Sequence, residues 1–283
     1  MKTPHYIFRD LIPFLIVSGL IIYGLILFYQ FITSPSNPIH MKPYTFFLIL
    51  GFAVAGTLVF IGCEVAGKQR THTEYSVMID RTDSMKAIPD KRSLITDIRI
   101  DKDIWNSVNF SFGYFSDVSL EPHLRLSLAQ APNRLAASEF TRKREVETFK
   151  ATLPSLLDSV LSDTAGKPNS SIYLPIAEEL TRLSKTTADR KVLVIYSDLM
   201  ENAPDLSFYS PNIFALFRTN PDKVKAMLFA KTKLPNLTGI EIILIYHPKN
   251  AQDDAVFRTV SNFFSTMFSQ AGATVTISAN LSN

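Results

Sequence analysis

Three oxygen-bearing side chains stand at alternate positions in the segment Asp80-Arg81-Thr82-Asp83-Ser84, directly after an apolar run at residues 75–79. The carboxylate of Asp80 and the hydroxyls of Thr82 and Ser84 are hard oxygen ligands, which cations such as Mg²⁺ prefer. The apolar run has the length of a buried strand, and open α/β sheets bind ligands where their strands end. The spacing therefore predicts a cation-binding loop. A plain turn, in which Asp and Ser bond their own backbone, is the alternative.

A second carboxylate, Asp198, follows a second apolar run at residues 191–196. Continuous apolar strands that alternate with helices indicate a mainly parallel sheet covered on both faces. Right-handed crossovers bring the carboxyl ends of such strands to one edge. We therefore expect Asp80 and Asp198 to lie at the same rim of the sheet.

A third group of oxygens precedes a helix expected at residues 172–184, in the segment Asn169-Ser170-Ser171. Ser and Asn are favoured at helix N-caps, so at least one of these serines is expected to cap the helix. The same position brings a hydroxyl, from Ser170 or from Ser171, to the rim that carries the two carboxylates.

The elements that must position these residues begin near residue 72. Strands are predicted at residues 75–79, 108–115, 124–128, 191–196, 241–246 and 274–278, and helices at 93–106, 136–163, 172–184, 212–218, 221–231 and 253–271. Apolar residues alternate with others in the second and third strands, which lie close in sequence, so these strands are expected to form a hairpin with an antiparallel edge. Pro154 is expected to break the long helix in two. The fold class is α/β, Rossmann-like, with helices on both faces.

Residues 200–238 form a longer connection than a simple crossover between strands needs. The connection includes the aromatic pair Phe208-Tyr209. Long connections at a binding rim often carry function, although an ordinary crossover helix is the simpler interpretation.

The N-terminal part has a different character. Residues 11–33 and 44–63 contain no charged side chain and are apolar on all sides. Each segment is long enough to cross a hydrocarbon core of about 30 Å as a helix. We predict a two-helix transmembrane hairpin within residues 1–67, followed by a separate domain at residues 72–283, in a multi-pass protein of a bacterial-type cell membrane.

The side of the membrane on which the domain lies depends on the flanking charges. Lys2 and Arg9 precede the first span, and Lys68 and Arg70 follow the second. The connector between the spans contains Lys42. Basic residues prefer the cytoplasm, so both ends and the domain are expected there. In the alternative, the run between Met41 and Cys63 resembles a bacterial lipoprotein signal, with Cys63 lipidated and the domain outside the cytoplasmic membrane.

Composition excludes several classes of function. The formal net charge is +3 and the basic residues form no block, which argues against a nucleic-acid-binding surface. The sequence has no Gly-x-Ser-x-Gly elbow, no P-loop and no His-Glu-x-x-His motif, and we predict that the chain is not an enzyme. Small residues at Gly51, Ala55 and Gly56 share one face of the second span, which would allow a partner span or a second copy to approach closely.

Together these residues resemble the von Willebrand factor A domain family. The metal-ion-dependent adhesion site of that family has an Asp-x-Ser/Thr-x-Ser motif after the first strand, a Thr or Ser before a helix, and an Asp after the fourth strand. Asp80-x-Thr82-x-Ser84 matches the first part and Asp198 the third. Ser170 matches the second part, because Ser170-Ser171-Ile172-Tyr173 is similar to the family's Thr-Asp-Ile-Tyr, and Ser171 is the rival position. The resemblance covers residues 72–283.

Two positions depart from the family pattern. Leu199 follows Asp198 where the family often has Gly, and Lys167-Pro168-Asn169 precedes Ser170 where the family has a Gly-rich loop. Both departures leave every candidate ligand position with an oxygen.

The resemblance implies a site for Mg²⁺ or Mn²⁺ whose coordination is completed by an acidic side chain of a protein partner. The implied metal ligands are Asp80, Thr82, Ser84, Ser170 and Asp198. The expected function is a membrane-anchored, cation-dependent binding module within a larger membrane assembly.

Two alternatives remain. A Mg²⁺-dependent phosphatase of the haloacid dehalogenase type also has an Asp after its first strand, but it usually has a second Asp where this chain has Thr82. A metal-free scaffold subunit of the same fold is the other alternative, which Leu199 favours.

Overall fold

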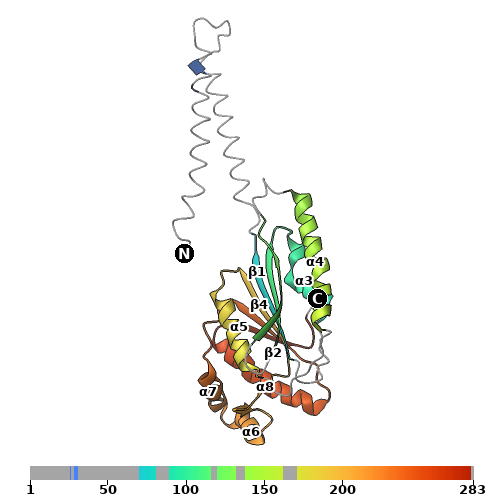
Figure 1. The fold of residues 1–283 in the computed structure, drawn as a ribbon. Helices are drawn as coiled ribbons and strands as arrows, with labels where there is room; N and C mark the ends of the chain where they lie inside the picture. Colours follow the sequence, from blue (N-terminus) through green and yellow to red (C-terminus); the bar gives the residue numbers. More distant parts are fainter. Residues whose placement is uncertain are drawn as a thin grey trace. The chain divides into compact units, whose positions relative to one another are not determined.

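The computed structural model describes residues 70–80, 89–115, 120–131, 138–161 and 171–281, together with Ile26, Tyr29 and Gln30. The chain divides into two units between Gln69 and Arg70. The described ranges from Arg70 onward form one α/β domain (Figure 1).

The domain is built on a six-stranded sheet with the order β3-β2-β1-β4-β7-β8. Its strands are β1 (His72–Ile79), β2 (Ser107–Phe115), β3 (Leu120–Leu128), β4 (Arg190–Tyr196), β7 (Ile240–Ile245) and β8 (Thr274–Ser278). Strand β3 pairs antiparallel with β2 at one edge, and all the other neighbouring strands pair in parallel. The predicted mainly parallel sheet with an antiparallel edge is confirmed. A short antiparallel pair, β5 (Asn202–Ala203) and β6 (Leu206–Ser207), follows β4.

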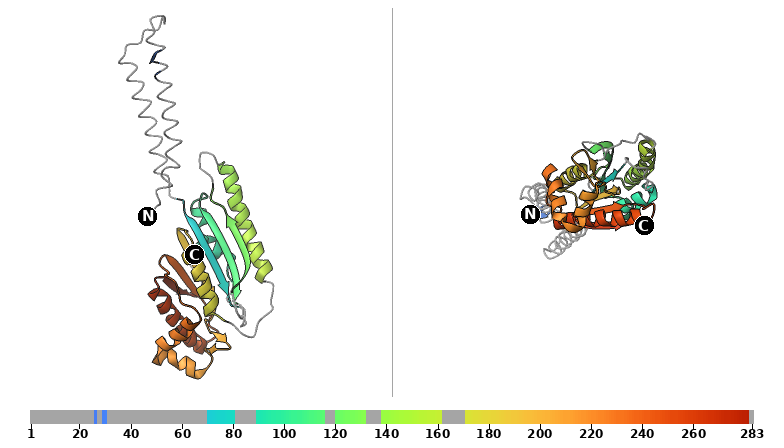
Figure 2. Two further views of the ribbon diagram at one scale, coloured as in Figure 1. Left: turned by 60° about the vertical axis from the view of Figure 1, so that its left-hand side comes forward. Right: turned by 90° about the horizontal axis from the view of Figure 1, so that it is seen from below.

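Helices cover both faces of this sheet. They are α3 (Lys91–Ile98), the short 3-10 helix η1 (Ile100–Lys102), α4 (Glu139–Leu161), α5 (Tyr173–Lys185), α6 (Pro211–Thr219), α7 (Pro221–Lys231) and α8 (Ala251–Gln270). Figure 2 shows α4 and α5 on opposite sides of the strands.

Alternation along the strands divides the core into two clusters. Val77 of β1 packs in one cluster with α3 and α4, whereas Met78 packs in the other cluster with residues of α5, α6, α7 and α8. Because successive side chains of a strand point to opposite faces, each strand of the middle of the sheet contributes to both clusters. This double burial explains the continuous apolar runs seen in the sequence.

The break expected at Pro154 is wrong, because α4 continues through this residue from Glu139 to Leu161. A proline inside a helix removes one backbone hydrogen bond, here the one to the carbonyl of the residue four positions earlier. Buried side chains before and after the proline, Val146, Phe149, Leu153 and Leu157, hold both halves against the sheet. The tertiary packing thus outweighs the local preference.

The helix expected at residues 93–106 is shorter than predicted. Helix α3 ends at Ile98, because Arg99 adopts a left-handed backbone conformation with φ of 62° and donates its amide to the Thr96 carbonyl. A single 3-10 turn, η1, follows. The remaining predicted elements agree with the structure to within a few residues at their ends, as is usual for helix and strand boundaries.

The predicted membrane spans, Cys63 and the small residues of the second span lie outside the described residues, apart from Ile26, Tyr29 and Gln30. Within the part of the chain that the structure describes, none of the helices combines the length and the apolar character needed to cross a membrane. The transmembrane hairpin stays a prediction.

Candidate cation site at the carboxyl edge of the sheet

Asp80 is the first residue after β1 and continues the ladder toward β4. Its backbone amide donates to the Tyr196 carbonyl at 2.9 Å, and its side chain is only 3% exposed. The Oδ2 atom of Asp80 accepts a hydrogen bond from the hydroxyl of Ser197 at 3.0 Å. The residue that follows β1 and the loop that follows β4 therefore meet at one rim, as the strand order requires.

Asp198 lies next to this contact, in the loop that leaves β4. Its side chain is half-buried, and its Oδ1 atom accepts a hydrogen bond from the Met200 amide at 2.9 Å. The Leu199 amide donates to the Ser197 hydroxyl at 2.9 Å. These two bonds close a tight turn at Ser197–Met200, and Ser197 of this turn contacts Asp80.

Leu199 adopts the left-handed backbone conformation, with φ of 63°. Glycine takes this conformation without steric penalty, whereas a side chain with a Cβ is strained in it. The buried Leu199 side chain packs in the cluster beneath α5, α7 and α8, and this packing holds the strained turn in place. The departure from the family's Gly thus occurs at a position where the turn has the conformation that glycine favours.

Three of the five predicted ligands, Thr82, Ser84 and Ser170, lie outside the described residues. Ser171 is described and buried, and its hydroxyl lies 3.4 Å from Oε1 of Glu201. The structure therefore brings Asp80 to the Asp198 loop, and it directs Ser171 toward a different carboxylate.

Glu201 is the residue that the sequence reasoning missed. Its carboxylate has no exposed surface, and Oε2 accepts hydrogen bonds from the amides of Ile172 and Tyr173, both at 2.8 Å. A carboxylate at a helix N-terminus interacts with the helix dipole and forms stronger bonds than a neutral hydroxyl does. Of the two serines expected to supply a cap, Ser171 does not cap α5, because Glu201 takes this role from a distant loop, and Ser170 lies outside the described residues.

The second oxygen of Glu201 binds the end of α7. Lys231 donates to Oε1 of Glu201 at 2.9 Å and pairs with Asp205 at 3.0 Å. Burial opposes the charge on Lys231, but the hydrogen bonds and charges of Glu201 and Asp205 prevail and raise its pKa above the ordinary value. Glu201 thus joins the loop that carries Asp198 to the start of α5 and to the end of α7. In the sequence, the one feature that points to a buried role for Glu201 is its position after the apolar pair Leu199-Met200, and this feature is not specific.

The donor atoms present fit a small, hard cation. Asp80 and Asp198 supply carboxylate oxygens at one rim, and the other predicted ligands are hydroxyls outside the described residues. Within the described ranges, no group of three or more His, Cys, Asp or Glu side chains is arranged to hold a metal ion. A cation here would therefore depend on hydroxyl ligands and on water as well as on the two carboxylates, a combination that Mg²⁺ accepts.

No protein-family model matches the chain, and no curated protein sequence matches it. Similar solved structures include the PilB minor pilin from Streptococcus sanguinis, with 11% identity and a TM-score of 0.44 over 76% of this chain and 59% of that one. The D319A mutant of the same pilin gives 9% identity and a TM-score of 0.45 over the same shares.

A third similar structure is the conserved hypothetical protein BatB from Bacteroides thetaiotaomicron. It shows 11% identity and a TM-score of 0.34 over 74% of this chain and 91% of that chain. This chain spans less than two thirds of the length of the pilin. All three likenesses are too distant to carry an argument about family or function, which leaves the rim residues themselves as the basis for a proposal.

Proposed function

We propose that the chain is a membrane-anchored module of the von Willebrand factor A type that binds a protein partner through Mg²⁺ or Mn²⁺. The proposed metal ligands are Asp80, Thr82, Ser84, Ser170 and Asp198. The observation that carries the proposal is the 3.0 Å hydrogen bond between Ser197 and Asp80, which places the Asp80 carboxylate beside the loop of Asp198. Asp80 and Asp198, two acids distant in sequence, each follow a strand at the edge where open α/β sheets bind ligands.

The chemistry of the site suits reversible binding of a carboxylate. Two protein carboxylates only balance the charge of a divalent ion, so a bound cation stays electrophilic and can exchange a water ligand for an acidic side chain of the partner. Ser197 orients Asp80, and the Met200 amide orients Asp198. Because the partner's acid would bind the ion directly, affinity for the ion and affinity for the partner should rise together.

The anchor and its side of the membrane belong to the same proposal. The two predicted spans would hold the domain at the cell membrane as part of a larger assembly, with the domain in the cytoplasm. Reporter fusions at Ser36 and at the C-terminus test this arrangement. Reporters that place Ser36 outside and the C-terminus inside support it, whereas an extracytoplasmic C-terminus with lipid on Cys63 would support the lipoprotein alternative.

Isothermal titration calorimetry with Mn²⁺ and Mg²⁺ tests the cation site. The parent chain should bind the ion, and Asp80→Asn and Asp198→Asn should weaken binding at least about tenfold, because each removes one of few ligand charges while keeping its shape. Glu178→Gln, an acid on the exposed face of α5, is the matched control and should change nothing. A parent chain without a metal response would refute the cation part of the proposal.

A metal-free scaffold is the second candidate. It is favoured by the closed rim, in which Asp80 already accepts from Ser197, and by Leu199 at the strained turn. If the chain is a metal-free scaffold, Asp80→Asn, Asp198→Asn and the parent chain should bind a partner equally well, with or without a chelator. We propose no enzymatic activity, and a phosphatase assay with Mg²⁺ tests the haloacid dehalogenase alternative.

A further inference from the structure

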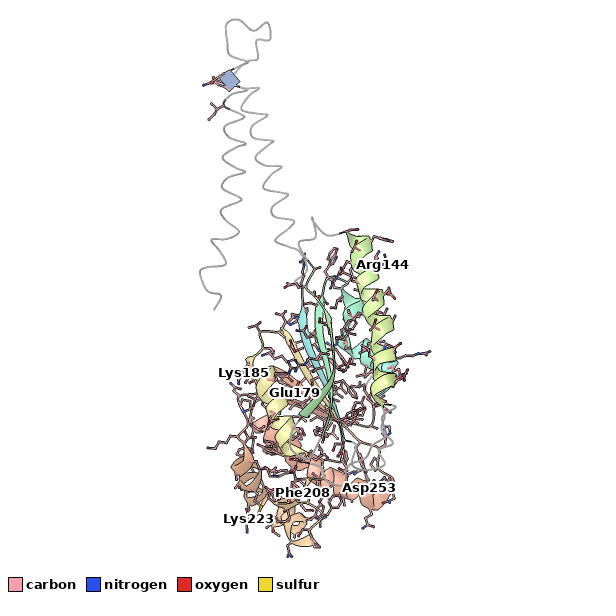
Figure 3. All side chains as sticks on the ribbon, viewed as in Figure 1. Arg144, Glu179, Lys185, Phe208, Lys223 and Asp253 are labelled. Atoms are coloured by element: carbon pink, nitrogen blue, oxygen red, sulfur yellow. The ribbon has the colours of Figure 1, made fainter. Side chains whose placement is uncertain are left out.

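A recess of about 490 Å³ opens beside the candidate cation site. Three segments line it: the loop after β4, the chain from Phe208 into the first turn of α6, and the chain from Lys249 into the first turns of α8. Figure 3 shows Phe208 and Asp253 at the same end of the domain. The volume lies in the range of pockets that hold ligands, and Asp198 itself forms part of the wall.

The walls of the recess are mainly apolar. The side chains that line it include Met200, Phe208, Tyr209, Phe214 and Val256. Phe208 is fully buried and packs edge-to-face on Phe217, with ring centroids 4.9 Å apart. This close packing fixes the position of the Phe208 side chain in the wall of the recess. Tyr209 is 57% exposed, and a ligand in the recess would remove part of this aromatic surface from water.

The polar groups of the recess are held in place by the fold. Asp253 accepts hydrogen bonds from the Tyr246 hydroxyl at 2.9 Å and from the Lys249 amide at 2.7 Å. Asp198 accepts from the Met200 amide. The recess itself carries two carboxylates, Asp198 and Asp253, and one exposed lysine, Lys249. The preference for an acidic ligand therefore comes from the ligand position that a cation at the rim would offer, with the charge of Lys249 close to it.

We propose that this recess receives a large apolar side chain of the partner, within two residues of the acidic side chain that binds the cation. The inference rests on the proposed function and names the class of its ligand: an extended peptide with an acid next to an aromatic or aliphatic anchor. Asp198 belongs to both the cation site and the recess, so one short segment reaches both. Residues i and i+2 of an extended chain lie about 7 Å apart on the same side, so one short segment can present both side chains to neighbouring sites that share Asp198.

Selection from a displayed peptide library tests the proposal. The library fixes one Asp and randomises three positions on each side of it, and it is selected on the full-length chain with Mn²⁺. Enriched peptides should carry Phe, Tyr, Trp, Leu or Met within two positions of the Asp. Replacing the Asp of an enriched peptide by Asn, or chelating Mn²⁺, should abolish its binding.

Two surface aromatics provide a matched pair of variants. Tyr209→Ser should weaken binding of an enriched peptide roughly tenfold to thirtyfold, the loss expected for an aromatic anchor. Phe140→Ser removes an aromatic that is 78% exposed at the start of α4 and does not line the recess, so it should leave the affinity unchanged. Lys249→Glu is a second recess variant, and it should weaken binding through charge alone. Mn²⁺ affinity should stay the same in Tyr209→Ser and in Phe140→Ser.

The outcomes separate this inference from the proposed function. Two results would refute the proposal for the recess without affecting the proposed cation site. In the first, the enriched peptides need Asp and Mn²⁺ but show no preference for an apolar residue. In the second, Tyr209→Ser and Phe140→Ser change the affinity equally. The absence of any enriched peptide, with Mn²⁺ binding intact, would also overturn the proposal for the recess. Peptides that need Tyr209 but neither Asp nor Mn²⁺ would assign the recess to another class of ligand. A parent chain that binds no Mn²⁺ would refute the cation site itself.

Discussion

Replacement of Glu201 by Ala should be among the most destabilising single changes in the domain. The change leaves the amides of Ile172 and Tyr173 without their acceptor, and it leaves Lys231, whose side chain is 14% exposed, without the more deeply buried of its two partners. Each unsatisfied buried donor costs about 1–3 kcal/mol, and removal of one partner of a buried ion pair costs about 3–5 kcal/mol. These losses overlap, because both arise from the same carboxylate. We therefore expect a fall of about 3–5 kcal/mol in the free energy of unfolding.

Urea denaturation and thermal unfolding measure this effect. For a domain of this size, 1 kcal/mol lowers the melting temperature by about 2–4 °C, so Glu201→Ala should lower it by roughly 6–20 °C. Glu201→Gln should recover only part of the loss, since its NH₂ group cannot accept a hydrogen bond. Glu178→Ala, on the exposed face of α5, should stay within about 0.5 kcal/mol of the parent.

A small effect would refute the reasoning about Glu201. If Glu201→Ala lowers the free energy of unfolding by less than about 1 kcal/mol, the start of α5 does not depend on this carboxylate. The same variant also reports on the rim, because Glu201 holds the loop of Asp198 against α5 and α7. Its Mn²⁺ affinity, measured well below its unfolding midpoint, should fall although Glu201 is not a proposed ligand.

Three further predictions concern residues that are not proposed ligands. Leu199→Gly relieves backbone strain of about 1–2 kcal/mol but loses a buried leucine worth about 2–5 kcal/mol, so urea denaturation should show a net loss, and a stabilised variant would contradict the packing argument. Pro154→Ala should raise the melting temperature, because a proline inside a helix costs about 3 kcal/mol; a lower melting temperature would mean that the proline fits α4 without strain. Burial opposes ionisation of Glu74, but hydrogen bonds from Asn109 and Arg182 outweigh it and keep its pKa below the ordinary value of 4.5. The contribution of Glu74 to stability should therefore be present above pH 4.5 and be lost as the pH falls through the lower folded-state pKa, and Glu74→Gln should flatten the acid limb of a stability profile.

Much of the fold could be predicted from sequence because each element carries its own pattern. The apolar runs that became β1 and β4 are buried on both faces, and the alternating residues of β2 and β3 identified the antiparallel edge. The strand order then required the chain after Ile79 and the chain after Tyr196 to share a rim, where Asp80 and Ser197 meet. The spacing of apolar residues within each element and the right-handedness of crossovers between parallel strands were sufficient to predict this shared rim.

The errors arose where a distant contact outweighed a local preference. Pro154 lies inside a continuous helix because apolar side chains on both sides of it are buried against the sheet. The start of α5 is capped by Glu201 and not by the adjacent Ser171, because the loop after β4 delivers a carboxylate to the helix amides. No spacing within residues 169–173 reveals that contact.

The sequence by itself determined the order of the elements, the two faces of the sheet and the side chains with ligand chemistry. Only the tertiary structure decided how the rim is held: the left-handed turn at Leu199, the bond from Ser197 to Asp80, and the triple role of Glu201 at α5, α7 and the Asp198 loop. The physical reason is the range of the interactions. The pattern of buried and exposed side chains follows from the spacing of residues within each helix or strand, so it can be recognised in the local sequence. The hydrogen-bond partners of a buried carboxylate come from segments distant in sequence, so they are known only from the folded structure.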